Sequence, residues 1–393
     1  MLKRFYKGDP LSAAAASPIA SFYRPNWIEV DLAAIRQNLK ILRRRISPRC
    51  RLLFVVKAGA YGHGAVETAR GTAGRRASGL VDWLGVFFVE EGIELREVGV
   101  VKPILVMGSL YPFDSYAAAA RYELRPTIAS LEGAVQLAEV GRILGRRLPG
   151  HLKIETGLGR IGARGKTAQK IIDFMSRSPH LKLEGIYTHF ACADTDRGAT
   201  LRQLELFEEA CREARGRGAV ISLRHAANSA AALRHPQSRL DMIRPGLAAY
   251  GLMPHPGCAF APALSWKAKI VFIKTASKGT TLSYGAGFRV KRPMRVATIP
   301  VGYGDGYPRL LSNKGQVLIG GRRCPVLGAV TMDMLMADVT PLPAAGVGEE
   351  VVLIGSQGAE EISVAEFSAW ARSIPYETVC RLAARVPRIF LNA

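Results

Sequence analysis

Lys57 is the first residue of this sequence whose position suggests chemistry. The apolar run LLFVV stops at Lys57, and AGAYGHG follows. If the run is a buried parallel strand, Lys57 stands at its carboxyl end, where barrel enzymes place their catalytic groups. Burial lowers the pKa of an amine, and a neutral amine can form a Schiff base with an aldehyde cofactor. A lysine that only extends from a strand end into solvent explains this stretch equally well.

Two later apolar runs end in histidines. IYTHFACAD carries His189, and RHAANSA carries His225, Asn228 and Ser229. A single histidine at a strand end is usually structural, but two on successive strands strengthen the case for a site beside Lys57. Ser229 precedes AAAL, so we expect it to cap a helix whose N-terminus binds an anion.

The stretch DMIRPGLAAYG adds two further residues to this expected site. Arg244 stands at another strand end, and Gly246 lacks a side chain that would keep a ligand away from the backbone. Together these stretches predict a site with one lysine, several cations and a helix N-terminus. That combination suits a phosphorylated aldehyde.

The sequence contains the spacing of a dinucleotide-binding motif, but the surrounding pattern does not fit such a site. IETGLGRIG contains Gly157, Gly159 and Gly162 in the spacing GxGxxG. In dinucleotide-binding proteins this motif follows the first strand of the fold, whereas here it follows the fifth predicted strand. Arg160 would also place a cation in a loop that must approach phosphates with its backbone. We therefore do not predict a dinucleotide site.

Eight apolar runs of strand length alternate with helical patterns over the first two thirds of the chain. The runs begin near residues 52, 83, 103, 124, 150, 183, 221 and 240, and amphipathic stretches such as LRQLELFEEACREARGRG lie between them. This alternation predicts an α/β fold with an N-terminal (β/α)8 TIM barrel. A doubly wound open sheet is the alternative.

After about residue 263 the pattern changes. Alternating segments such as LSWKAKIVFIKTA and EEVVLIG are joined by Gly, Pro and Lys, which is typical of antiparallel strands. We therefore predict an N-terminal extension over residues 1–25, a cofactor-binding barrel over 26–263, and a C-terminal, mainly antiparallel β domain over 264–393.

Composition and charge argue against several classes of protein. The 393 residues include no apolar run near the ~20 residues that cross a bilayer. The six cysteines are scattered and never spaced as CxxC, which fits a reducing compartment and argues against a zinc site. The net charge of +22 is spread along the chain, so we expect a solvated basic surface that attracts small anions rather than a nucleic-acid interface.

In combination, the motifs point to a known family. The stretches VVKAGAYGHG, KIETGLGRIG, YTHFACAD, HAANSA, DMIRPGLAAYGL, LSYGAGF, VGYGDGYPR and MDM resemble those of alanine racemases, in the same order, from about Trp27 to Phe390. The resemblance implies a fold-type III pyridoxal 5'-phosphate enzyme that interconverts L-alanine and D-alanine, a precursor of bacterial peptidoglycan. It also implies a cytoplasmic homodimer whose active sites are shared between subunits, with no metal, nucleic acid or membrane.

The resemblance assigns roles around the reacting carbon. Lys57 matches the lysine that holds the cofactor and acts as one base, and Tyr284 matches the base on the opposite face. Racemisation removes a proton from one face and returns one on the other, so two opposed bases suit it. Arg244 matches the arginine beside the pyridine nitrogen, which leaves that nitrogen neutral and disfavours transamination. His189 matches the residue that links this arginine to the tyrosine.

The remaining matches concern the phosphate and the substrate. The residues that match phosphate contacts are Tyr61, Ser229, Gly246 and Leu247. Arg160 and the backbone of Met332 match the anchor for the substrate carboxylate, and Tyr303 matches a residue at the mouth of the site. Lys153 matches a lysine that some members carry as a carbamate, which orients Arg160.

Three positions depart from the family pattern. Ala384 stands where a tyrosine commonly contacts the phosphate, Gly59 where a polar residue is frequent, and Thr331 where a cysteine is common before MDM. We expect the first to weaken cofactor retention and the other two to adjust the shape of the pocket.

Other functions stay open at this point. A racemase of another small amino acid, such as serine, would keep every motif. A fold-type III decarboxylase would need a carboxylate at the pyridine nitrogen, where Arg244 stands, and a pyridoxal phosphate carrier resembles the barrel alone and lacks the later residues that bear Tyr284.

Overall fold

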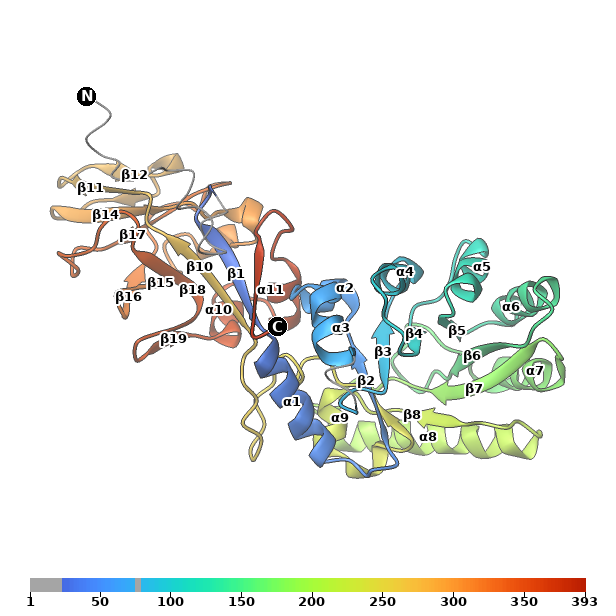
Figure 1. Ribbon diagram of the computed structural model, residues 1–393. Coiled ribbons are helices and arrows are strands. Elements are labelled where there is room, and N and C mark those ends of the chain that lie inside the picture. The colour runs from blue at the N-terminus through green and yellow to red at the C-terminus, as the bar shows by residue number, and fades with distance from the viewer. Residues whose placement is uncertain (1–22, 75–78) are drawn as a thin grey trace. The chain divides into compact units, whose positions relative to one another are not determined.

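The computed structural model describes residues 23–74 and 79–393, so most of the predicted extension over residues 1–25 lies outside the described part of the chain. Two compact units can be distinguished (Figure 1). The barrel unit comprises Leu32–Ala263, and the β unit comprises Leu264–Asn392 with the described residues up to Asp31. None of the described helices is long and apolar enough to span a membrane.

The barrel unit is built on eight parallel strands in the order β8-β7-β6-β5-β4-β3-β2-β9. The strands are β2 (Arg51–Val55), β3 (Trp83–Val86), β4 (Ile104–Val106), β5 (Arg125–Ile128), β6 (Leu148–Lys153), β7 (Leu181–Tyr187), β8 (Leu223–His225) and β9 (Met242–Ile243). Backbone hydrogen bonds from Asp241 to Arg224 and from Arg244 to Ala227 link the two end strands. The predicted TIM barrel is confirmed, and the open doubly wound sheet is wrong.

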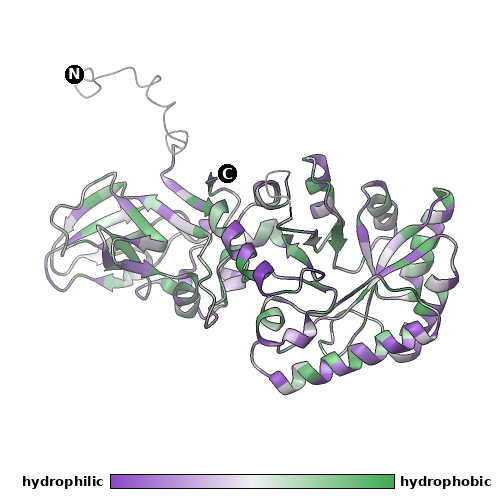
Figure 2. Ribbon diagram, turned by 60° about the horizontal axis from the view of Figure 1, so that its bottom comes forward, coloured by the Kyte–Doolittle hydropathy of each residue, from purple (hydrophilic) through white to green (hydrophobic). Residues whose placement is uncertain are grey.

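Helices surround these strands (Figure 1). They are α1 (Leu32–Arg44), α2 (Lys57–Tyr61), α3 (Ala65–Ala73), α4 (Val89–Glu97), α5 (Asp114–Arg121), α6 (Leu131–Ile143), α7 (Gly165–Arg177), α8 (Arg197–Gly216), α9 (Ser229–Arg234) and the 3-10 turn η5 (Pro236–Ser238). Each long helix buries one stripe, and α8 shows hydrophilic and hydrophobic bands along its length (Figure 2). In α7, for example, Ala168, Ile171, Ile172 and Met175 are buried at a helical spacing.

The β unit contains a seven-stranded sheet, a three-stranded sheet and a short hairpin. The large sheet holds β1 (Asn26–Asp31), β10 (Leu264–Lys269), β15 (Gln316–Ile319), β16 (Arg322–Pro325), β18 (Glu350–Gln357), β19 (Glu360–Ile362) and β20 (Arg388–Leu391). The small sheet holds β11 (Phe272–Ala276), β14 (Met294–Ile299) and β17 (Leu335–Asp338), and the hairpin pairs β12 (Thr281–Leu282) with β13 (Phe288–Arg289). Nearly all pairings are antiparallel, as predicted.

Short helical elements connect these strands. They are η6 (Tyr284–Ala286), η7 (Tyr303–Asp305), η8 (Arg309–Leu311), α10 (Val364–Trp370) and α11 (Pro375–Cys380). Helix α10 is capped by Ser363, whose side chain accepts a hydrogen bond from the Glu366 backbone.

The first strand corrects the predicted division of the chain. We expect residues 26–263 to form the barrel, but β1 pairs antiparallel with β10 and parallel with β20, both in the β unit. Its pattern NWIEVD shows that it is a strand with buried positions. The identity of its partner depends on strands more than two hundred residues away in sequence, which its own pattern does not encode.

Candidate active site

Lys57 opens a strained turn directly after β2. The backbone from Ala58 to Tyr61 is left-handed, with φ between 53° and 61°. Left-handed residues other than glycine cost roughly 1–2 kcal/mol each, so other contacts must hold the turn. The Glu91 carboxylate accepts a hydrogen bond from the Ala58 backbone at 2.5 Å, and the Tyr61 ring packs 5.1 Å from that of Tyr250. Strain of this kind concentrates at functional sites.

Ser229, Gly246 and Tyr61 form a cradle after β8 and β9. The Ser229 hydroxyl oxygen accepts hydrogen bonds from the backbone of Gly246 at 3.0 Å and of Ala248 at 3.3 Å. A Cβ at Gly246 would lie 2.5 Å from the Tyr61 hydroxyl oxygen, so any larger residue would have to displace Tyr61 or the loop. Buried Leu247 follows directly in the chain. The cradle offers hydroxyl and backbone groups that suit an anionic ligand.

The cap of α9 corrects a sequence-based expectation. The Asn228 side chain, not that of Ser229, accepts the hydrogen bond from the Ala231 backbone, at 2.9 Å. Ser229 is the first residue of the helix, and its side chain turns to the Gly246 loop instead. Both residue types cap helices well, so the sequence alone does not distinguish them.

Arg244 is buried directly after β9 and is fixed by several acceptors. Its guanidinium donates to the carbonyls of Thr188 at 2.6 Å and Ala226 at 3.1 Å, and to His225 Nδ1 at 3.0 Å. It lies 3.5 Å from His189 Nδ1. Burial lowers the pKa of Arg244 to about 10, so the group stays protonated at neutral pH.

His189 is a neutral group in this environment. Burial first, and then repulsion from Arg244 and Lys153, hold the pKa of its imidazole well below the ordinary value. The 3.5 Å distance to Arg244 is at the long limit of a hydrogen bond. The structure therefore brings His189 to Arg244, as predicted.

Lys153 ends β6 inside a crowd of positive charge. It is buried, and its ammonium lies 5.5 Å from the centre of the Tyr187 ring. Burial, followed by the charges of Arg160 and Arg244, lowers the pKa of Lys153 to about 8. A bound anion would relieve this repulsion, which fits a ligand with a phosphate or a carboxylate.

The loop over residues 157–162 binds a carboxylate of the protein itself. The Glu155 side chain accepts a hydrogen bond from the Gly157 backbone at 2.5 Å. Burial raises the pKa of Glu155, but hydrogen bonds from the backbone of Gly159, Gly157, Arg160 and Leu158 lower it by more. Because these amides already bind Glu155, the loop is not a dinucleotide phosphate loop.

In the β unit, Tyr284 is displayed on a strained turn. Ser283 and Ala286 on either side have φ of 65° and 50°, and the Tyr284 side chain is 75% exposed. It borders a hollow of about 490 Å³ whose other lining residues include Thr331 and Met334. A tyrosine that stabilises a core is buried. An exposed tyrosine on a strained backbone instead suggests that its side chain contacts a ligand.

Tyr303 and Met332 lie on two segments that are joined by backbone hydrogen bonds. The Tyr303 amide donates to the Thr331 carbonyl and the Gly304 amide to the Met332 carbonyl, both at 2.9 Å. Both side chains are exposed. The structure thus brings these two predicted site residues together within the β unit.

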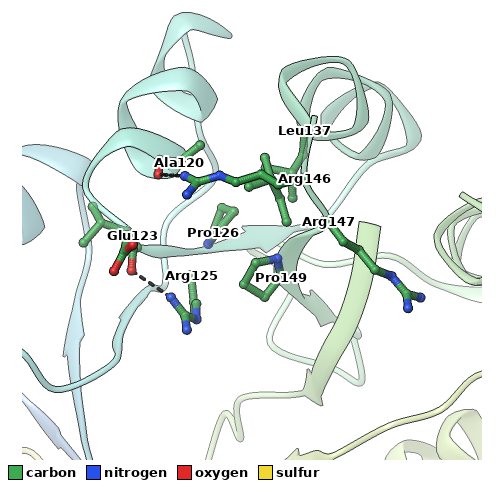
Figure 3. Close-up of a pocket in the computed structure, with 10 residues that line it drawn as sticks. Ala120, Glu123, Arg125, Pro126, Leu137, Arg146, Arg147 and Pro149 are labelled. Atoms are coloured by element: carbon green, nitrogen blue, oxygen red, sulfur yellow. Dashed lines mark hydrogen bonds between the residues drawn. The ribbon is translucent and has the colours of Figure 1, made fainter. Parts of the chain in front are cut away.

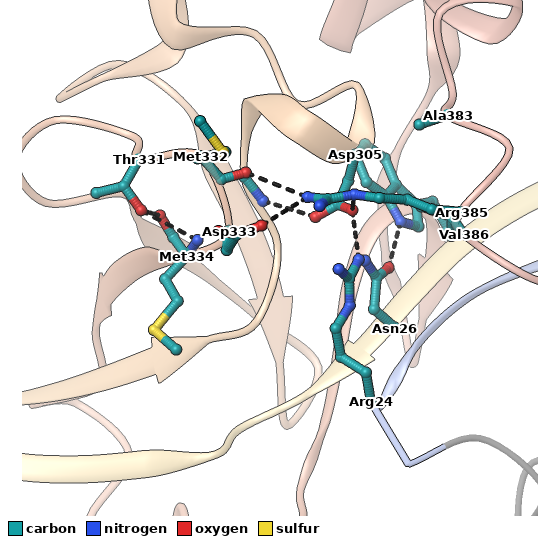
Figure 4. A network of polar contacts seen from close by, with 12 residues as sticks. Arg24, Asn26, Asp305, Thr331, Met332, Asp333, Met334, Ala383, Arg385 and Val386 are labelled. Carbon is teal, nitrogen blue, oxygen red and sulfur yellow. Dashed lines mark hydrogen bonds and ion pairs between the residues drawn. The ribbon is translucent and has the colours of Figure 1, made fainter.

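The sequence analysis did not predict the residues that hold the segments of Tyr303 and Met332 in place (Figure 4). Buried Asp305 accepts hydrogen bonds from Arg24, from Arg385 Nε at 2.8 Å and from the Gly302 backbone at 3.0 Å. Arg385 also contacts the Asp333 carboxylate at 2.8 Å. The charged residues inside the glycine- and proline-rich motifs GYGDGYP and ARVPR were the available signal.

No group of three or more His, Cys, Asp or Glu suited to a metal ion is found in residues 23–74 and 79–393. Within the same two ranges, Cys50, Cys192, Cys211, Cys258 and Cys324 form no disulfide.

Comparisons with known proteins cover nearly the whole chain. Residues 30–254 match the family model of the alanine racemase N-terminal domain, and residues 263–390 match that of the alanine racemase C-terminal domain. The alanine racemase of Symbiobacterium thermophilum is 46% identical over 372 residues, which cover 93% of this chain and 97% of that protein.

Solved structures agree. A crystal structure of alanine racemase from Bacillus anthracis has a TM-score of 0.87 at 35% identity and covers 94% of this chain and 96% of that one. Alanine racemase from a Streptomyces lavendulae that produces D-cycloserine has a TM-score of 0.88 at 31% identity, with 95% and 98% covered.

Proposed function

The chain belongs to the alanine racemase family, and we propose that it interconverts L-alanine and D-alanine with pyridoxal 5'-phosphate, using Lys57 and Tyr284 as the two bases. The observation that carries this proposal is the cradle of Ser229 and Gly246 beside Arg244, on the same ends of the barrel strands as Lys57. These residues suit a phosphorylated aromatic aldehyde, because they offer a cradle for the phosphate, a cation for the ring and an amine for the aldehyde.

The residues present fit this cofactor. At Gly246 a single Cβ would collide with the Tyr61 hydroxyl, so the glycine lets this hydroxyl approach the backbone beside Ser229, where both hydroxyl groups can face a phosphate. Ser229 accepts two backbone hydrogen bonds, which leaves its own hydroxyl hydrogen to donate to a phosphate oxygen. The proposed phosphate contacts are Tyr61, Ser229, Gly246 and Leu247. When bound, the cofactor supplies a sink for the electrons of the broken Cα–H bond.

Arg244 controls how strong that sink becomes. A guanidinium has five N–H donors and no acceptor, and a pKa of about 10 keeps it protonated at neutral pH. A ring nitrogen that faces Arg244 must therefore accept a hydrogen bond and stays unprotonated. This favours a brief loss of the Cα proton, which racemisation needs, over the longer-lived charge that leads to transamination.

The two bases act on opposite faces of the substrate. In our proposal Lys57 Nζ takes or returns the Cα proton on one face, and the Tyr284 hydroxyl does the same on the other. Arg160 and the Met332 backbone amide hold the substrate carboxylate, Tyr303 stands at the mouth, and His189 links Arg244 to the tyrosine.

We further propose that Lys153 carries a carbamate. A pKa of about 8 gives it a larger neutral fraction at neutral pH than an ordinary lysine has, and the neutral amine is the form that adds to CO₂ with release of a proton. The added negative charge would offset the repulsion between Lys153 and Arg160.

The proposed working unit is a homodimer in which the partner subunit's Tyr284 completes the site of Lys57. Its support is the family to which the chain belongs, because the described chain alone offers each base on a different unit.

The test is the stereochemical fate of alanine. We expect purified protein loaded with pyridoxal 5'-phosphate to convert L-alanine into an equal mixture of enantiomers, measured by chiral chromatography. The Tyr284→Phe variant should lose this activity, whereas Tyr376→Phe, another partly exposed tyrosine of the β unit, should keep it. Release of CO₂ or unchanged L-alanine would contradict the proposal.

A further inference from the structure

A row of polar side chains crosses the interior of the barrel unit. At one end Arg244 Nη1 donates to His225 Nδ1 at 3.0 Å. His225 Nε2 lies 2.9 Å from His151 Nδ1, and His151 Nε2 lies 3.5 Å from a carboxylate oxygen of Glu184. At the other end Arg125 Nε contacts the same oxygen at 3.1 Å.

The packing around the row leaves its members few other partners. Both imidazoles are fully buried. A Cβ at Gly185 would lie 2.4 Å from His151 Nδ1, so this glycine makes room for the ring. Tyr187 stacks on His225 with the ring centroids 4.8 Å apart and the planes almost parallel. The imidazoles are therefore held in the orientation in which their nitrogens meet.

The row joins opposite ends of the barrel. Arg244 follows β9 at the carboxyl ends of the strands, whereas Arg125 is the first residue of β5 at their amino ends. Arg125 also lines a hollow of about 220 Å³ at this base, together with Glu123 and Arg146 (Figure 3). The Glu184 end of the row is thus remote from the cradle formed by Ser229 and Gly246.

The two ends dictate where every proton in the row lies. A guanidinium only donates hydrogen bonds, so His225 Nδ1 must accept and the neutral ring carries its proton on Nε2. That proton points to His151 Nδ1, which must also accept, so His151 carries its proton on Nε2. A carboxylate only accepts, and Glu184 is what His151 Nε2 faces. Both ends lead to the same arrangement.

The distance to Glu184 makes this contact the longest in the row. Within residues 23–74 and 79–393, His151 Nε2 has no acceptor at ordinary hydrogen-bond geometry. The acceptor that it faces is the Glu184 carboxylate oxygen, 3.5 Å away. Were the lone pair of Nε2 turned to the carboxylate, two acceptors would oppose each other in the interior, so the protonated nitrogen is favoured.

The charges along the row agree with neutral imidazoles. Burial, and then the charge of Arg244, hold the pKa of His225 well below its ordinary value. Burial also lowers the pKa of His151, although Glu184 acts in the opposite direction. Burial raises the pKa of Glu184, but His151, Arg125 and Lys182 together lower it to about 2, so the carboxylate stays ionised.

We propose that Glu184 and His151 are positioning residues that, through His225, keep the Arg244 guanidinium turned to the active site. This rests on the proposed role of Arg244 beside the cofactor ring. Without the acceptor at Glu184, the reversed arrangement becomes accessible, in which both imidazoles carry the proton on Nδ1. His225 would then present an N–H to the N–H of Arg244, and the guanidinium would turn away.

The experiment compares Glu184→Ala with two controls. Glu184→Gln keeps an acceptor at the same place and should rescue. Asp241→Asn removes a different barrel carboxylate, which pairs with Arg224 at 2.8 Å and lies outside the row. The first readout is the ¹H–¹⁵N spectrum of labelled imidazoles in the protein without cofactor, which reports the tautomer of each ring. The second, in the loaded enzyme, is the ratio of racemisation to side transamination.

We expect the wild-type, Glu184→Gln and Asp241→Asn proteins to show both rings as neutral Nε2–H tautomers. Glu184→Ala should lose that pattern for His225 and raise the share of transamination roughly tenfold, because an unsatisfied buried donor shifts an equilibrium by about that factor. If Glu184→Ala does not fold, His151→Phe with His151→Gln as its rescue takes its place.

The outcomes separate this inference from the proposed function. Unchanged tautomers in Glu184→Ala, or changed tautomers with an unchanged ratio of products, would overturn the positioning role. Failure of the wild-type protein to racemise alanine would overturn the proposed function, and the imidazole spectrum would still show whether the row is arranged as inferred.

Discussion

Gly246 and Arg244 show how far the proposed cofactor site depends on single residues. Gly246 is needed because the Tyr61 hydroxyl occupies the place of its missing side chain. Arg244 is needed because a donor-only group decides the protonation of whatever nitrogen it faces. Neither role involves the proton transfer itself, yet each limits which reaction the two proposed bases can perform.

A methyl group at Gly246 should therefore weaken the cofactor site. In Gly246→Ala the new Cβ would lie 2.5 Å from the Tyr61 hydroxyl, so Tyr61 or the loop must move. We expect the Kd for pyridoxal 5'-phosphate to rise by a factor of about 5 to 150, since overpacking of this kind costs roughly 1–3 kcal/mol. Absorbance titration of the cofactor-free protein measures it.

Gly216→Ala is the matched control for that measurement. A Cβ at Gly216, the last residue of α8, meets no atom within 4 Å. It should leave the affinity unchanged. Equal affinities in the two variants would show that the Gly246 cradle does not hold the cofactor.

The positions of several candidate site residues were predictable, because these residues lie where apolar runs end. Lys57, His189, His225 and Arg244 follow or end barrel strands, and the sequence marks those ends by a change from apolar to polar residues. The contact between His151 and His225 was not predictable in the same way. These residues are 74 positions apart, and their meeting depends on the glycine opposite them on β7.

At the scale of elements, two turns present the proposed bases with unfavourable backbone. The turn after β2 is left-handed from Ala58 to Tyr61, and η6 follows Ser283 with a φ of 65°. A run of small residues such as KAGAY does not predict a left-handed turn, because glycine and alanine are compatible with many conformations. The strand ends were predictable and the turns that complete them were not.

The turn that carries Met332 depends on Arg385. Removing the side chain in Arg385→Ala breaks its contacts to buried Asp305 and to Asp333, while Arg24 still pairs with Asp305. We expect a loss of about 1–3 kcal/mol of unfolding free energy from the weakened buried carboxylate. If the Met332 backbone holds the substrate carboxylate, as proposed, KM for alanine should rise by a larger factor than that by which kcat falls.

Arg381→Ala controls for the loss of a surface arginine. Arg381 pairs with Glu377 one turn earlier in sequence, and both are exposed, so the expected cost is about 0.5 kcal/mol or less. Denaturant unfolding and steady-state kinetics on both variants provide the comparison. A change in kcat alone for Arg385→Ala would argue against a role in holding the substrate carboxylate.

At the scale of the whole molecule, the sequence predicted two units but not how the chain is divided between them. The barrel and the antiparallel sheets differ in the period of their apolar residues, which made the change near residue 263 visible. The sequence did not place strand β1 in the β unit, because the residue pattern of a single strand is similar in both kinds of sheet. The choice of partner is a property of the assembled sheet.

The most direct test of the account is complementation between two inactive variants. Lys57→Ala and Tyr284→Ala should each be nearly inactive, and they are mixed under conditions that allow subunits to exchange. If the partner subunit's Tyr284 completes the site of Lys57, each mixed dimer has one site with both lesions and one with neither. Random pairing then predicts about a quarter of the wild-type alanine racemase activity. No recovery, with mixed dimers shown to form, would contradict the shared two-base site.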